Sequence, residues 1–135
     1  MTTSHQLINL TTSQMVDARK ELAKFFTLTK HVEDSSELKM FSAAVDEAWH
    51  QLIENADEYK AFCLETAGVV LGHSPSDGAG VVEWVATYED LYGELPEIWF
   101  TRTDGTVEND LLREYRSGGT IVASWNCTVI LPTME

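Results

Sequence analysis

Apolar residues recur at helical spacing in four segments of the chain, and this periodicity is the strongest constraint on its fold. Spacings of three and four residues place side chains on one face of an α-helix, where they can pack against other helices. The segments cover residues 11–26, 36–55, 56–68 and 81–93. We therefore expect a mainly α domain, built as a small bundle of about four helices with a short C-terminal β extension.

Capping residues stand at the expected ends of these helices. Ser35 or Ser36 precedes the second helix, and Asn55 separates the second helix from the third. Such side chains accept hydrogen bonds from the first backbone N–H groups of a helix. Gly68 and Gly93 follow the third and fourth helices, and glycine readily adopts the left-handed conformation that ends a helix. These positions set the predicted helix boundaries.

The segments outside the four helices predict a loop and a short β extension. Residues 72–80 hold three Gly, two Ser, one Pro and one Asp, which is a composition typical of a loop. Residues 95–100 are expected to form a short extended segment or a single turn, and residues 109–119 a short helix. Residues 120–131 are rich in β-branched side chains and indicate one strand or a hairpin.

The C-terminal strand needs a partner, because a lone strand is not stable in water. It must pair within the chain or with a second copy, so a homodimer through this strand is an open alternative. With 135 residues, the chain is expected to be a single domain, 1–135. Its helical core would span 37–100, and its C-terminal extension would span 101–135.

The charge of the chain excludes one class of partner. Nine Lys and Arg against 22 Asp and Glu give a formal net charge of −13, and no Lys or Arg occurs from Ala61 to Thr101. Such a surface repels phosphate backbones, so direct nucleic-acid binding is not expected. It would attract a basic protein, imitate nucleic acid towards one, or serve only solubility. The candidate partner-binding residues are Glu83, Glu89, Asp90, Glu94 and Glu97.

The remaining composition is that of a cytoplasmic protein. No apolar run approaches the roughly 18 residues of a membrane span, and the polar start MTTSHQ does not read as a signal peptide. Two cysteines, Cys63 and Cys127, are too few for the disulfide framework of a secreted protein. We expect a cytoplasmic protein that does not contact a membrane.

Four potential metal ligands come from segments that a helical hairpin would bring together. Asp46 and His50 are four residues apart on the second helix, so they share a face. Cys63 lies on the third helix, and His73 lies in the predicted loop. These side chains are all ligands for zinc, and four of them suit a tetrahedral site. The pattern suggests zinc but is not specific for it, since neither CxxC nor HExxH occurs, and a structural role of these polar side chains is favoured.

The same residues allow two other interpretations. Asp46 can accept a hydrogen bond from His50 and orient its ring, with Cys63 as a small buried residue of the core. Cys63 can also pair with His50 or His73 as a nucleophile and its base. However, Cys63 sits within a helix, away from the helix N-terminus that activates many catalytic thiols. No GxSxG motif occurs either, so an enzyme is less expected than a binding module.

The order of several short motifs points to a family. The motifs are Val45-Asp46, Trp49-His50, Tyr59, Phe62-Cys63, Gly72-His73 and Pro75, followed by YEDLYGELPEIWF. Over about residues 37–100 this order resembles the bacterial glycine-rich domain-containing protein-like family of the DUF1399 type. The resemblance implies a small helical module. The sequence departs from the family at Gly72, where the family has His, and at Leu52, where some relatives have His.

These observations lead to three hypotheses about function. The first is a small acidic binding module, an adaptor or inhibitor, that docks on a basic protein and adds its C-terminal strand to the sheet of that protein. The second is a zinc-binding helical domain with hydrolase activity if the site is open. Four protein ligands would close the site, whereas three ligands and a water molecule would leave it open. The third is a mimic of nucleic acid.

Overall fold

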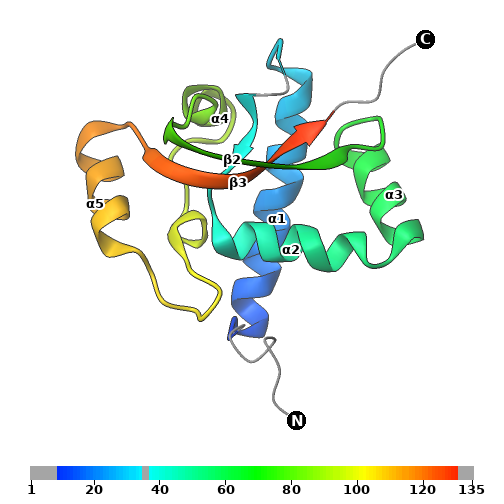
Figure 1. The fold of residues 1–135 in the computed structure, drawn as a ribbon, viewed down its shortest axis with the longest axis horizontal. Helices are drawn as coiled ribbons and strands as arrows, with labels where there is room; N and C mark the ends of the chain where they lie inside the picture. The colour runs from blue at the N-terminus through cyan, green and yellow to red at the C-terminus, as the bar shows by residue number, and fades with distance from the viewer. Residues whose placement is uncertain (1–8, 35–36, 131–135) are drawn as a thin grey trace.

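Five α-helices pack around a small antiparallel sheet in the computed structural model, which describes residues 9–34 and 37–130 (Figure 1). The helices are α1 Thr12–Thr27, α2 Ala43–Ile53, α3 Ala56–Thr66, α4 Val85–Tyr92 and α5 Asn109–Gly118. The strands are β1 Lys39–Met40, β2 Gly72–Val81 and β3 Val122–Ile130, and the 3-10 turns are η2 Leu28–Lys30 and η4 Glu97–Phe100. The strand order is β1-β3-β2, which places β3 in the centre of the sheet.

This architecture is mixed α/β, so the predicted four-helix bundle with a short C-terminal β extension is wrong. Strand β3 pairs with β1 on one side and with β2 on the other, and both partners come from the segment predicted as a helical core. The C-terminal strand therefore finds its partners within the chain. An isolated bridge between Thr101 and Val107 adds a second, minimal sheet. A homodimer through β3 stays a prediction.

Strand β2 takes the place of the loop predicted for residues 72–80. Gly78 lies opposite Trp125 of β3, and a Cβ atom at Gly78 would come within 2.7 Å of the indole ring. The aromatic ring thus covers the space that the glycine leaves on the partner strand. The register shifts between Pro75 and Gly78, so the proline borders an irregular part of the ladder. These residues therefore have structural roles in β2, although the amino-acid composition of the segment had predicted a loop.

Helix α2 begins later than the sequence predicted. Ser42 caps it, because its hydroxyl oxygen accepts a hydrogen bond from the Val45 N–H at 3.1 Å. The predicted caps, Ser35 and Ser36, lie outside the described residues. Strand β1 occupies the segment between them and α2. A strand of two residues is too short to produce an alternating pattern, so no local sequence signal marks it.

Most other elements confirm their predictions. Helix α1 covers the segment predicted at 11–26, and Asn55 caps α3. Gly93 ends α4 with a φ of 90°, in the region that favours glycine. The turn predicted at 95–100 is η4, and the short helix predicted at 109–119 is α5.

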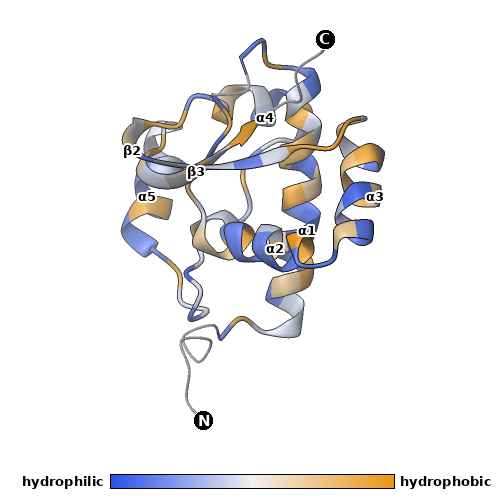
Figure 2. Cartoon of the chain, turned by 45° about the vertical axis from the view of Figure 1, so that its right-hand side comes forward, coloured by the Kyte–Doolittle hydropathy of each residue, from blue (hydrophilic) through white to orange (hydrophobic). Residues whose placement is uncertain are grey.

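The helices are amphipathic, as their apolar spacing predicted. Figure 2 shows hydrophobic and hydrophilic residues together along α1, α2 and α3. Their fully buried side chains include Phe25, Phe26 and Trp49. Among the described residues, no helix combines the length and the apolar character that a membrane span requires.

A buried carboxylate connects three elements of the core. Glu21 of α1 is only 5% exposed, and its Oε1 accepts hydrogen bonds from the Tyr88 hydroxyl at 2.5 Å and from Trp99 Nε1 at 2.9 Å. Lys24 Nζ lies 3.0 Å from Glu21 Oε2 and supplies the opposite charge. Burial, and then the Glu21 carboxylate, raises the pKa of Tyr88, so its hydroxyl remains a donor. Glu21 therefore joins α1 to α4 and η4.

We expect Glu21→Ala to lower the free energy of unfolding by roughly 2–4 kcal/mol, because two buried donors lose their acceptor. Chemical denaturation followed by tryptophan fluorescence measures this change. Glu65→Ala is the control, since Glu65 is exposed on α3 and its loss should change stability by less than about 0.5 kcal/mol. If Glu21→Ala were as stable as the wild type, the carboxylate would not hold these elements together.

We expect Gly78→Ala to destabilise the fold by roughly 1–3 kcal/mol, because the added Cβ must displace the Trp125 ring. Gly118→Ala is the matched control. Gly118 is the last residue of α5, and a Cβ there would meet nothing within 4 Å, so alanine should be neutral or stabilising. Thermal unfolding of both variants gives the comparison. Equal tolerance of the two substitutions would indicate a loop at residues 72–80 in place of β2.

Candidate metal centre

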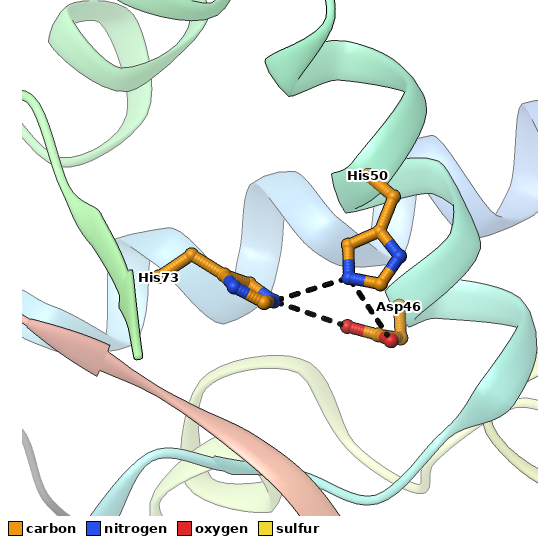
Figure 3. Close-up of side chains that lie close together, drawn as sticks. All are labelled: Asp46, His50 and His73. Atoms are coloured by element: carbon orange, nitrogen blue, oxygen red, sulfur yellow. Dashed lines mark hydrogen bonds and ion pairs between the residues drawn. The ribbon is translucent and has the colours of Figure 1, made fainter. Parts of the chain in front are cut away.

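Helix α2 and strand β2 bring three potential ligands to one place (Figure 3). Asp46 and His50 are four residues apart on α2, so their side chains project from the same face. His73 is the second residue of β2 and points towards them from the sheet. The pair on α2 was evident from the sequence, whereas the approach of His73 depends on the sheet.

The donor atoms of these residues lie close together. His50 Nε2 lies 3.2 Å from His73 Nε2 and 3.5 Å from Asp46 Oδ2. His73 Nε2 lies 3.6 Å from Asp46 Oδ1, the other oxygen of the carboxylate. In the described part of the chain, one group of three His, Cys, Asp or Glu residues has donor atoms all within 4.8 Å of one another, and it is this group.

These separations are those of ion pairs, and they also match the spacing of ligand atoms around a metal ion. An N–H···O hydrogen bond spans about 2.7–3.2 Å, so the His–Asp separations of 3.5 and 3.6 Å are too long. Ligand atoms bound about 2.0–2.2 Å from a tetrahedral zinc ion lie about 3.3–3.6 Å from one another. Asp46 therefore contacts the two histidines at ion-pair distances, and both the metal site and the structural role of this cluster stay predictions.

The site borders both the core and the solvent. The side chains of Asp46 and His73 are 19% and 20% exposed, and that of His50 is 49% exposed. Trp49 packs edge-on against the His73 ring, with ring centroids 4.5 Å apart. The Trp49 indole donates a hydrogen bond to the Tyr59 hydroxyl at 3.2 Å, which fixes the indole against the core. His73 is therefore held in place, and the exposed His50 gives an ion a path of entry.

Cys127 of β3 also contacts Asp46. It was not among the site residues predicted from the sequence. Its Sγ donates a hydrogen bond to Asp46 Oδ1 at 3.1 Å, and the residue is buried. Burial, and then the Asp46 carboxylate, raises the pKa of the Cys127 thiol well above its ordinary value. His73 pairs with Val129, two residues after Cys127, so the strand pairing places both side chains on the same face of the sheet. Only the register of β2 and β3 reveals this proximity.

Cys63, the predicted fourth ligand, lies elsewhere. It is fully buried on α3, and its Sγ accepts a hydrogen bond from the Leu71 N–H at 3.5 Å. The group of donor atoms around Asp46 does not include its thiol. The structure thus brings together Asp46, His50 and His73, and it keeps Cys63 as a core residue. The pairing of Cys63 with a histidine for nucleophilic catalysis is not formed.

The predicted partner-binding residues are largely engaged within the chain. Glu83 Oε1 lies 3.2 Å from Lys39 Nζ, and Glu94 Oε2 lies 3.7 Å from Arg116 Nε. Glu89 accepts a hydrogen bond from the Tyr115 hydroxyl at 2.5 Å. Asp90 and Glu97 are exposed. Three of the five carboxylates therefore already have intramolecular partners.

The N-terminal part of the chain matches the model of a protein family. The UCP032817-like model matches residues 2–82, more than half of the chain. This chain belongs to the UCP032817-like family. The matched region contains Asp46, His50 and His73, whereas Cys127 lies beyond it. No curated protein and no solved structure has a significant match to the chain.

The predicted membership of the DUF1399-type glycine-rich family is therefore wrong. The UCP032817-like match begins at residue 2 and includes α1, whereas the supposed resemblance covered only about residues 37–100. That resemblance depended on short motifs such as Trp49-His50 and Phe62-Cys63, and residue pairs of this kind recur in unrelated chains. The candidate site accordingly stands on its own geometry.

Proposed function

We propose that this protein binds a zinc ion through Asp46, His50 and His73. The observation that carries this proposal is the convergence of the three side chains, which offer one donor atom each within 4.8 Å of the others. The two imidazole nitrogens are 3.2 Å apart and lie 3.5 and 3.6 Å from the two oxygens of the carboxylate, near the spacing of ligand atoms around zinc. Two imidazoles and one carboxylate form a set that zinc accepts readily. Calcium and magnesium prefer oxygen ligands, so they suit this set less well.

The proposed role of the ion is to support the domain. Its ligands come from a helix and from a strand that follows more than a full helix later in the chain, so the ion would link α2 directly to β2. The unfolded chain does not hold these ligands together, and the free energy of zinc binding therefore contributes to folding. We propose a metal-supported domain on this basis.

Docking on a basic protein is the other function predicted from the charge, and it stays a prediction. Glu83 and Glu94 form ion pairs with Lys39 and Arg116, which offsets part of the negative charge that such a partner would meet. No contact among the described residues favours a basic partner over the metal site. The same is true of mimicry of nucleic acid.

We expect the purified protein to contain about one zinc ion per chain by elemental analysis, because three protein ligands suffice for a stable site. His50→Ala and His73→Ala should each abolish stoichiometric zinc. His31→Ala is the matched control, since His31 is exposed and lies outside the group of donor atoms. This control should retain the metal content of the wild type.

Zinc should also stabilise the folded protein. Zinc at 100 times its dissociation constant would raise the free energy of unfolding by about 2.7 kcal/mol, because it binds the native state. The melting temperature should therefore rise with zinc and fall after chelation, in the wild type and in His31→Ala but not in His50→Ala. A folded, metal-free protein whose melting temperature ignored added zinc would contradict the proposed function.

A further inference from the structure

The thiol of Cys127 contacts one of the three proposed ligands but is not itself part of the proposed site. Strand β3 holds this side chain at 1% residue exposure, with its Sγ 3.1 Å from Asp46 Oδ1. Asp46 Oδ1 is also the oxygen that lies 3.6 Å from His73 Nε2. The sulfur therefore contacts the carboxylate of the group from the buried strand β3, whereas the His50 side chain is 49% exposed.

We propose that Cys127 is the fourth ligand of the zinc ion, so that the ion is bound by two histidines, one aspartate and one thiolate. This inference rests on the proposed function and specifies it further. The Cys127 thiol would lose its proton to solvent and form a sulfur–zinc bond, with no change in the oxidation state of either atom. Thiolate is a preferred zinc ligand, and a set of four protein ligands is usual for structural zinc sites.

The position of the sulfur suits this role. A sulfur atom about 2.3 Å from zinc and an oxygen atom about 2.0–2.2 Å from zinc lie roughly 3.5 Å apart at two corners of a tetrahedron. Cys127 Sγ and Asp46 Oδ1 are already 3.1 Å apart, close to that spacing. The sulfur lies outside the group of donor atoms that are all within 4.8 Å of one another, so ion binding would have to draw the thiol towards the two histidines. The ligands would then come from α2, β2 and β3.

A fourth protein ligand determines the class of the site. It leaves no coordination position for a water molecule, so the site is structural and the zinc-hydrolase alternative does not apply. The ion would fasten the central strand β3 and its neighbour β2 to helix α2. Cys127 lies outside the family-matched residues 2–82, so the C-terminal part of the chain would complete a site whose other ligands come from the matched part.

The competing explanation is that Cys127 only donates a hydrogen bond to Asp46, as a partner outside the coordination sphere. Loss of such an outer partner lowers metal affinity by about 10- to 100-fold. Loss of a ligand removes a bond to the metal and should lower affinity by more than this. The two explanations differ only in how much zinc affinity would be lost on substitution. The test therefore needs a signal that comes from the sulfur–metal bond itself.

Cobalt(II) in place of zinc supplies that signal, because a bound thiolate gives cobalt an intense near-ultraviolet charge-transfer absorption that nitrogen and oxygen ligands do not give. We would titrate cobalt into the full chain as wild type, Cys127→Ser and Cys63→Ser. Cys63 is the matched control, since it is the other buried thiol and its Sγ contacts the Leu71 N–H, whereas the Sγ of Cys127 contacts Asp46. We expect the charge-transfer band in the wild type and in Cys63→Ser, and its loss in Cys127→Ser.

Each other outcome contradicts a specific statement. Cobalt binding without a charge-transfer band in the wild type would leave the three-ligand site intact and overturn the role of Cys127. A band lost in Cys63→Ser but kept in Cys127→Ser would make Cys63 the ligand. Absence of cobalt and zinc binding in the wild type would overturn the proposed function itself.

A second measurement covers the case in which Cys127→Ser does not fold. Zinc K-edge X-ray absorption of the wild type and of Cys63→Ser counts the sulfur atoms bound to the ion. We expect one sulfur at about 2.3 Å in both proteins. A coordination shell of nitrogen and oxygen alone would overturn the inference, whatever the behaviour of the serine variant.

Discussion

The antiparallel pairing of β2 with β3 is the interaction on which the candidate site depends. It extends from Gly72–Ile130 to Val81–Val122, and it is the reason that residues 72–81 form a strand at all. Because His73 pairs with Val129, its ring is on the face of the sheet that also carries Cys127. Helix α2 lies against these residues, so that Asp46 contacts both His73 and Cys127, and His50 contacts His73. Without this register, the potential ligands would belong to separate segments.

Aromatic packing in the core holds helix α2 and His73 in position. Trp49 belongs to α2, and it packs edge-on against Phe26 of α1, with ring centroids 5.3 Å apart, as well as against His73. The same α1 carries Glu21, whose hydrogen bonds reach α4 and η4. The orientation of α2, and therefore of Asp46 and His50, is thus tied to the part of the fold that is most completely buried. A metal ion would add a bond between this core and the sheet.

The sequence predicted the helices well, because their apolar spacing is a local signal. It also found Asp46 and His50, since a separation of four residues has a fixed meaning on a helix. His73 was also included in the predicted site. Its segment was wrongly predicted as a loop, because residues 72–80 are rich in glycine, and Gly78 in fact makes room for the Trp125 ring of β3. Cys127 could not be found, since strand register is a relation between distant segments that no local pattern encodes. The fourth ligand predicted from the sequence was the thiol of Cys63, which the structure places in the core.

The most direct test of the account is an anomalous X-ray diffraction measurement on crystals grown with zinc, with data collected on both sides of the zinc absorption edge. The account predicts an anomalous peak about 2.0–2.3 Å from the donor atoms of Asp46, His50, His73 and Cys127. A peak elsewhere on the molecule would contradict it. So would the absence of a peak, with the two histidine rings hydrogen-bonded to each other and nothing between them and the carboxylate.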